Sequence, residues 1–231
     1  MAVAELAGKE PEIDVFRQVR FEMYLRWTAA ALALLFVGGA IGFAIRQPDS
    51  PPGANSADVG FLYDMTEHHD QAIRMSNLLL MNGESPQVAV FAREILRSQS
   101  LEIGLMRRQL ESWGYSPEAE RPAMGWMGHE TAVDKMEGMA TSKEVDALLA
   151  ARGRDADALF IALMKDHHRG GIEMATAAAE RAADPFVQDL ATLMAKNQRY
   201  EIGEMEQARV RVGLVAAPAG YAPESSEQHQ G

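Results

Sequence analysis

The chain has 231 residues, 14 methionines, no cysteine and a formal net charge of −11. The absence of cysteine excludes disulfide frameworks, thiolate zinc sites and cysteine nucleophiles. The first 46 residues hold five acids and five bases, so the net charge lies in the remainder, where 28 acids face 17 bases. That surface would repel nucleic acid and attract cations.

An uncharged stretch from Trp27 to Ile45 is close to the ~20 apolar residues that a helix needs to cross a bilayer. We therefore predict a transmembrane signal anchor over residues 26–46, preceded by a cytoplasmic segment, residues 1–25. Basic residues precede the stretch, whereas after Arg46 the next one is Arg74. This asymmetry places the rest of the chain outside the cytoplasm, in the periplasm or at the cell surface. A cleaved signal peptide and a buried soluble helix are the alternatives.

Residues 47–57 read as a linker rich in proline, serine and asparagine, and residues 214–231 as a disordered tail. The domain between them, residues 58–213, has helical periodicity without strand alternation. It contains a repeat, because the chain aligns with itself at an offset of 99 residues without a gap. The matched pairs include Met65/Met164, His68/His167, His69/His168, Met75/Met174, Pro86/Pro185, Gln99/Gln198, Glu102/Glu201 and Met106/Met205.

Each repeat, residues 58–113 and residues 154–213, predicts a helical hairpin. Ser85-Pro86 and Asp184-Pro185 each supply an N-cap followed by proline at the first helical position. One hairpin cannot bury its apolar face alone, so we expect an all-α, antiparallel four-helix bundle. In the connector, residues 114–153, the TSKE sequence from Thr141 is a capping box and predicts a shorter helix.

The repeated polar residues fall on the apolar faces of these helices. At 100° per residue, His68 lies at the centre of its face and His69 on the shoulder, and the second repeat copies this geometry. On the following helix, Gln99 lies at the centre of the apolar face with Glu102 at its flank. Buried polar groups cost several kcal/mol unless they are hydrogen-bonded or bound to something. They are therefore either core histidines bonded to Gln99, Glu102 or their counterparts, or ligands of a metal.

The ligand types favour a soft metal. A Glu-x-x-His motif, typical of di-iron bundles, is missing, which makes iron unlikely. Methionine stands where a hard oxygen ligand would be needed, and thioether with imidazole suits copper, particularly Cu(I). Glu102 and Glu201 are expected as partners that fix the histidine tautomers or as occasional ligands. The candidate metal site comprises Met65, His68, His69, Met75, Glu102, Met106, Met164, His167, His168, Met174, Glu201 and Met205.

Residues 58–210, with two M-x-x-H-H-x5-M copies and the Trp113-Gly114 hairpin end, resemble a known family. It is the domain-of-unknown-function family numbered three hundred and five, bacterial exported ferritin-like proteins built from two two-helix repeats. The resemblance implies a ferritin-like fold, and because some members look like copper-binding proteins of the CopM type, it implies a copper role. This chain departs from the pattern in its membrane helix and in Gly170-Gly171, which we expect to loosen the second repeat's first helix.

The leading interpretation is a non-enzymatic, membrane-anchored, extracytoplasmic protein that binds copper for buffering, storage or resistance. The alternatives are a ferritin-like oxidoreductase with a metal centre and a structural module of the envelope that binds no metal. The expected protein partners are a second copy of the chain, in a homodimer, or another envelope protein. The connector raises a similar choice between a copper acceptor loop and a cap over the open end of the bundle. The residues concerned are Met124, Trp126, Met127, His129, Met136 and Met139.

Overall fold

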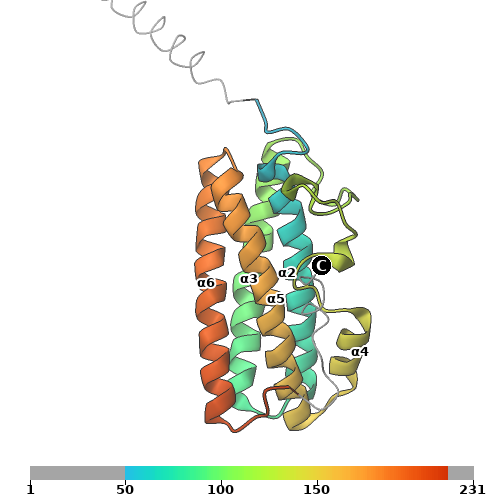
Figure 1. The fold of residues 1–231 in the computed structure, drawn as a ribbon, viewed down its shortest axis with the longest axis vertical. Coiled ribbons are helices and arrows are strands. Elements are labelled where there is room, and N and C mark those ends of the chain that lie inside the picture. The colour runs from blue at the N-terminus through green and yellow to red at the C-terminus, as the bar shows by residue number, and fades with distance from the viewer. Residues whose placement is uncertain (1–49, 218–231) are drawn as a thin grey trace, which may run out of the picture. The chain divides into compact units, whose positions relative to one another are not determined.

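The computed structural model describes residues 50–217, which are helical apart from caps, turns and the connector (Figure 1). Its α-helices are α2 (Ala57–Asn82), α3 (Pro86–Ser112), α4 (Ser142–Ala150), α5 (Gly153–Arg181) and α6 (Pro185–Arg211). Within these residues an isolated bridge between Ala123 and Thr131 is the only extended pairing. The predicted all-helical bundle is therefore confirmed.

The segment predicted to cross the membrane, residues 26–46, lies outside the described residues. Among residues 50–217, no helix has the length and apolar character that a membrane crossing requires.

Three helices, α3, α4 and α6, begin where their predicted caps place them. Ser85 and Asp184 cap α3 and α6 through their side-chain oxygens, and each is followed by proline in the first turn. Thr141 and Glu144 form the complete capping box of α4. The chain leaves α3 through Gly114, whose φ of 82° is a conformation that glycine adopts without strain.

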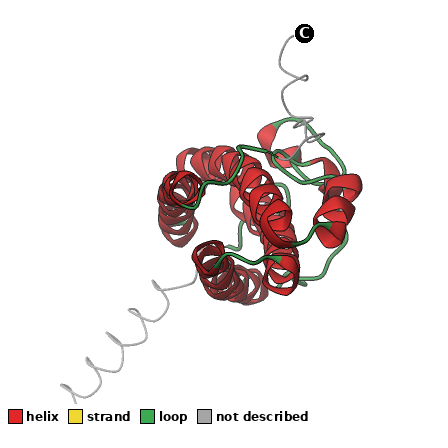
Figure 2. Cartoon of the chain, turned by 90° about the horizontal axis from the view of Figure 1, so that it is seen from below, coloured by secondary structure: helices red, strands yellow, loops and turns green. Residues whose placement is uncertain are grey.

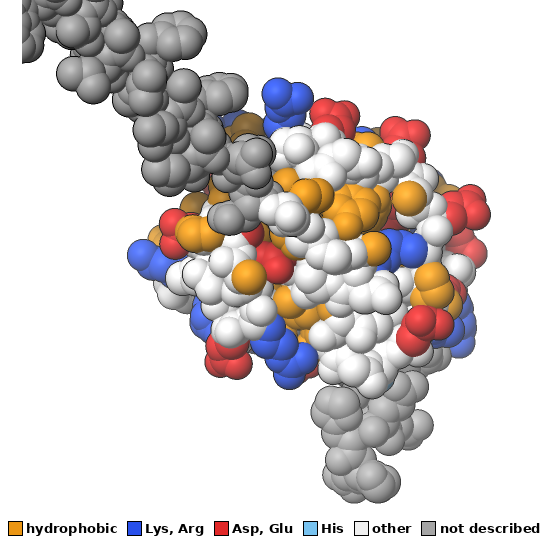
Figure 3. Space-filling model, turned by 90° about the horizontal axis from the view of Figure 1, so that it is seen from above, with side chains coloured by type: hydrophobic (Ala, Val, Ile, Leu, Met, Phe, Trp, Pro, Cys, Tyr) orange, Lys and Arg blue, Asp and Glu red, His pale blue; other side chains and the backbone are white. Residues whose placement is uncertain are grey.

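The two repeats fold as two hairpins, α2 with α3 and α5 with α6, and the hairpins join mainly through α2 and α5. The bundle seen end-on shows the long helices surrounding a common interior (Figure 2). On the uncovered part of the opposite end, charged side chains of both signs lie around the edge while apolar side chains gather nearer the middle (Figure 3).

A reciprocal contact fixes how the hairpins meet. Buried Asp58, in the first turn of α2, accepts hydrogen bonds from the backbone N–H groups of Ala183 (3.0 Å) and Asp184 (2.7 Å) in the opposite hairpin's turn. Its counterpart Asp157 accepts from Ser85 N (2.9 Å) and Glu84 N (3.4 Å). Each hairpin thus caps the turn of the other, because a carboxylate satisfies backbone donors that the turn leaves free.

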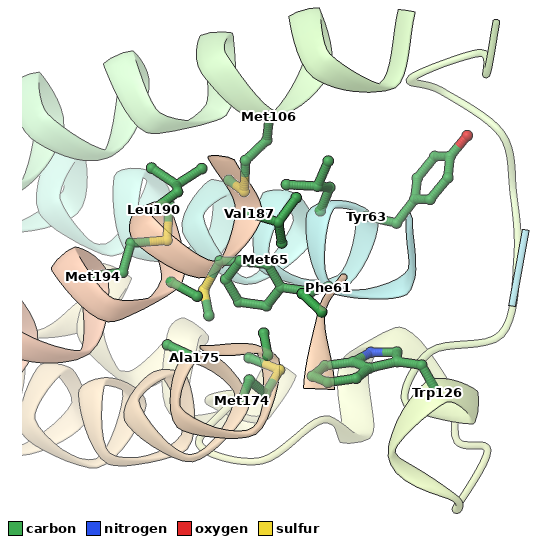
Figure 4. Packing of buried hydrophobic residues seen from close by; sticks show 14 of the residues in the cluster. Phe61, Tyr63, Met65, Met106, Trp126, Met174, Ala175, Val187, Leu190 and Met194 are labelled. Carbon is green, nitrogen blue, oxygen red and sulfur yellow. The ribbon is translucent and has the colours of Figure 1, made fainter. Parts of the chain in front are cut away.

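The apolar core forms two clusters, one toward each end of the bundle. The first, named here the Trp126 cluster, contains Trp126 and the buried apolar side chains of α2 between residues 59 and 65 (Figure 4). The second, the Leu148 cluster, contains Leu148 and the buried apolar side chains of α2 between residues 72 and 79. The stretch of α2 between the two clusters contains both of its histidines. The core is therefore interrupted halfway along the bundle by a polar layer.

The connector closes one side of the bundle. Trp126 packs edge-to-face on Phe61 with ring centroids 6.2 Å apart, and its indole N–H donates to buried Asp64 (2.7 Å). Met124 and Met136 are buried in the same cluster, while Met127 and Met139 pack against it. His129 is exposed. The side chains of this segment thus take the positions expected of a cap over the bundle.

Candidate metal centre

Four histidines occupy the polar layer. His68 and His69 on α2 and His167 and His168 on α5 are each at most 1% exposed. The rings of His68 and His167 face each other across the two hairpins, with centroids 3.7 Å apart and planes inclined by 32°. The His167 and His168 rings lie 6.3 Å apart. The layer is therefore a cluster of imidazoles contributed by both repeats.

Hydrogen bonds determine which ring nitrogens are free. His68 Nε2 donates to the backbone carbonyl of Glu137 at 3.1 Å, which leaves its Nδ1 with a lone pair and no partner. Neither ring nitrogen of His167 has a hydrogen bond of normal geometry, although a contact with the backbone of His68 acts to raise its pKa against the larger effect of burial. Buried polar atoms are normally satisfied, so this concentration of unpaired nitrogens marks the layer as unusual within the described chain.

The outer histidine of each pair has a carboxylate partner on the second helix of its own hairpin. His69 Nε2 donates to Glu102 at 2.8 Å, and His168 Nε2 donates to Glu201 at 2.6 Å. The Nδ1 atoms of both rings are buried and unpaired. These contacts place Glu102 and Glu201 beside His69 and His168, in a carboxylate–histidine arrangement that fixes the orientation and tautomer of each ring.

The central imidazoles are neutral. Burial, followed by repulsion from His69, lowers the pKa of His68 to about 3. Burial, followed by repulsion from His68 and His168, also holds the pKa of His167 well below its ordinary value. At neutral pH both rings therefore keep the lone pair that metal coordination requires.

The methionines are shared between the hairpins. In the Trp126 cluster, Met65 of the first repeat lies with Met174 of the second, together with Met106 and Met194. Figure 4 shows Met65, Met106 and Met194 directed into the same interior from α2, α3 and α6. In the Leu148 cluster the counterparts Met75, Met164 and Met205 lie together. Thioethers thus occur on both sides of the imidazole layer.

Two glutamines add unpaired oxygens to the interior. Gln99 and Gln198 are 3% and 4% exposed, and the Oε1 atom of each has no hydrogen-bond partner. The amide of Gln198 lies directly against α5, since a Cβ on Gly171 would come within 2.3 Å of its Oε1. The helical positions of these glutamines already marked them as inward-facing, although the ligand set above omits them.

The expectation that Gly170 and Gly171 loosen their helix is wrong. α5 is continuous from Gly153 to Arg181, and both glycines are buried. They serve close packing instead, because a Cβ on Gly170 would lie 2.0 Å from the carbonyl oxygen of Glu137. A glycine in a helix interior that has a close backbone neighbour contributes contact that offsets its lower helical propensity.

Within residues 50–217, no group of three or more histidine, aspartate or glutamate side chains is placed to hold a metal ion. The contacts instead give imidazoles in pairs, His68 with His167 and the outer ones with their glutamates, between two layers of thioethers.

Fold and site together define a class: helical bundles of two hairpins whose interior carries imidazoles between layers of methionine. Residues 58–209 match the model of the family described as domain of unknown function (DUF305). The chain belongs to this family. No curated protein matches it.

Solved structures show the same fold. A Streptomyces coelicolor DUF305 protein, described as a candidate secreted protein, is 34% identical with a TM-score of 0.65, over 70% of this chain and 97% of its own. A DUF305 fragment from Deinococcus radiodurans is 28% identical with a TM-score of 0.58, over 67% and 96%. CopM in its Cu(I)-bound form is 27% identical with a TM-score of 0.52, over 67% and 96%.

Proposed function

We propose that this protein binds copper in the interior of its helical bundle. The observation that carries the proposal is the stacked pair of His68 and His167, fully buried, neutral and with unpaired ring nitrogens. An unpaired buried nitrogen is costly, and a metal that accepts its lone pair removes that cost. No other part of the described chain brings together so many buried nitrogens without a hydrogen-bond partner.

The residues present fit copper. Imidazole nitrogen and thioether sulfur suit Cu(I), which is a soft ion. Met65 and Met164 each lie one helical turn before a central histidine, on the same face of the helix. The outer histidines, held by Glu102 and Glu201, present a second pair of free Nδ1 atoms. Copper bound here would be held by imidazole nitrogens and thioether sulfurs of both repeats, a ligand set that favours the Cu(I) state.

The comparisons support this choice of metal. CopM, which shares the fold at 27% identity, has been solved in a Cu(I)-bound form, and at 25% identity in a Cu(II)-bound form. The duplicated histidine and methionine pattern of this chain lies within the matched residues 58–209.

The proposed role is copper buffering, storage or resistance outside the cytoplasm. The charge-free residues 27–45, with basic residues before them and few after them, support a membrane anchor that faces the domain outward. The description of the Streptomyces coelicolor relative as a candidate secreted protein also supports an extracytoplasmic domain.

The test uses the full chain, purified in mild detergent and titrated with Cu(I) under reducing conditions against a chromogenic chelator. We expect at least one tightly bound equivalent and a higher melting temperature, since ligand at about 100 times Kd adds roughly 2.7 kcal/mol to the free energy of unfolding. The variant His68→Leu/His167→Leu should lose this binding. His129→Ala, which removes an exposed imidazole, is the matched control.

A thioether variant separates ligation from packing. Met65→Leu nearly conserves volume and should cost under about 1.5 kcal/mol of stability, yet weaken Cu(I) binding. Retention of full Cu(I) affinity and stoichiometry by the double histidine variant would refute the proposed site. The histidines would then be core residues of the bundle.

A further inference from the structure

A short strap, residues 136–140 of the connector, crosses the bundle beside the central histidine pair. It lies on the side where α2 meets α5 (Figure 1). The carbonyl of Glu137 in the strap accepts the hydrogen bond of His68 Nε2 at 3.1 Å. A backbone carbonyl can only accept, so the proton of neutral His68 resides on Nε2.

The strap is seated on the backbone of α5. A Cβ on Gly170 would lie 2.0 Å from the Glu137 oxygen. A Cβ on Gly138, whose φ is 76°, would lie 2.8 Å from the carbonyl oxygens of Asp166 and His167. Both glycines therefore permit an approach that a larger residue would prevent.

The strap is also held to α2. Gln71 uses its whole amide on one residue, donating from Nε2 to Ala140 O (2.8 Å) and accepting at Oε1 from Ala140 N (2.7 Å). This paired contact lies three residues after His68 on the same helix. The position of the Glu137 carbonyl is thus fixed from both helices that carry the central histidines.

The strap makes the two repeats unequal. It belongs to the connector and has no second copy at the offset of 99 residues. His68 consequently has a fixed proton position, whereas no hydrogen bond of comparable geometry fixes the proton of His167.

We propose that Glu137, through its backbone carbonyl, is a positioning residue that locks His68 as the Nε2–H tautomer and reserves Nδ1 for the metal, while His167 remains free to change tautomer. The biological role of this lock rests on the proposed copper site. The tautomer of His68 itself does not depend on copper. The hydrogen bond acts on the metal-free protein. The strap therefore assigns one repeat a preorganised ligand and the other an adaptable one.

The test measures the histidine tautomers directly, by imidazole 15N shifts and long-range couplings in the metal-free full chain labelled at histidine. In the wild type at neutral pH, His68 should be a single Nε2–H tautomer and His167 a mixture. Gly170→Ala forces the Glu137 carbonyl away, so the His68 signal should become a mixture. Gly171→Ala is the matched control, because its Cβ meets Gln198 and not the strap.

Gln71→Leu provides a second route to the same state, since it releases the strap without adding bulk to α5. It should also shift the tautomer of His68. A mixed tautomer of His68 in the wild type would overturn the proposal. So would an unchanged tautomer in a folded Gly170→Ala or Gln71→Leu variant whose Glu137 amide signal has moved.

Copper affinity distinguishes this proposal from the function on which it rests. Loss of such a partner typically weakens metal binding about 10- to 100-fold, and we expect this for Cu(I) in Gly170→Ala relative to the wild type. A locked His68 in a protein that binds no copper would refute the proposed function alone. Copper binding with an unlocked His68 would refute the positioning role alone.

Discussion

Replacing Asp58 by alanine tests the reciprocal contact that joins the hairpins. The substitution removes the acceptor of two backbone N–H groups, at 3.0 and 2.7 Å, from a side chain that is 2% exposed. Each unsatisfied donor costs about 1–3 kcal/mol, and relief from burying a carboxylate offsets part of this. We expect a net loss of about 2–4 kcal/mol in the free energy of unfolding.

The equivalent change at Asp157 should cost less. One of its two bonds is long, at 3.4 Å, and its Oδ1 is buried without a partner. Burial, only partly offset by its bonds to Ser85 and Glu84, also raises the pKa of Asp157. Asp157→Ala should therefore lose about 1–2 kcal/mol.

Urea unfolding of the full chain, followed by circular dichroism, measures both variants. Asp189→Ala, at an exposed position of α6, is the control and should stay within about 0.5 kcal/mol of the wild type. An Asp58→Ala variant as stable as this control, or less affected than Asp157→Ala, would show that the contact contributes little and would refute the reasoning.

Three further results are expected. Lowering the pH from about 7 to about 4.5 should destabilise the metal-free fold by roughly 2.5 kcal/mol through His68, because its pKa of about 3 lies below the unfolded value and only the unfolded chain takes up the proton. The lowered pKa of His167 acts in the same direction. If the free energy of unfolding in urea changed as much with pH in the His68→Leu/His167→Leu variant as in the wild type, the contributions of both histidines would be contradicted. Gly60→Ala should cost about 1–3 kcal/mol and shift tryptophan fluorescence, since its Cβ would lie 2.3 Å from Trp126 Cδ1. Gly104→Ala should instead stabilise the protein by about 1 kcal/mol in thermal melts, because alanine has the higher helical propensity and the new Cβ would enter open space. A destabilised Gly104→Ala variant would show that helical propensity does not determine stability at this position.

The local signals in the sequence were sufficient for the helices and for the polar layer. Capping by Ser85, Asp184 and Thr141 follows from side-chain chemistry that acts within a few residues. The inward position of His68 follows from helical period alone. These features depend on neighbours in the chain, which is why they could be predicted.

The contacts between the two hairpins could not be predicted from helical periodicity, because periodicity gives the face on which a residue lies but not its neighbour across the bundle. The helical angle of Met65 shows that it faces inward. It does not show that Met65 shares an apolar cluster with Met174 of the other repeat rather than with Met75 of its own. The Glu137 carbonyl leaves no trace in the sequence, because every residue has one. The glycine at position 170 was a signal of close backbone approach, which we interpreted as a loosened helix.

The exchanged contacts have a consequence for how such a protein can arise. Asp58 caps the second hairpin and Asp157 caps the first, while Met65 and Met164 each join methionines of the opposite repeat. This is the self-complementary pattern of a twofold symmetric dimer, in which the same patch serves both subunits. A chain half as long, carrying one hairpin, would form the same interior by pairing with its own copy. Fusion of two such halves leaves the symmetric interior intact and frees the joining segment to break the symmetry, as the strap does at His68.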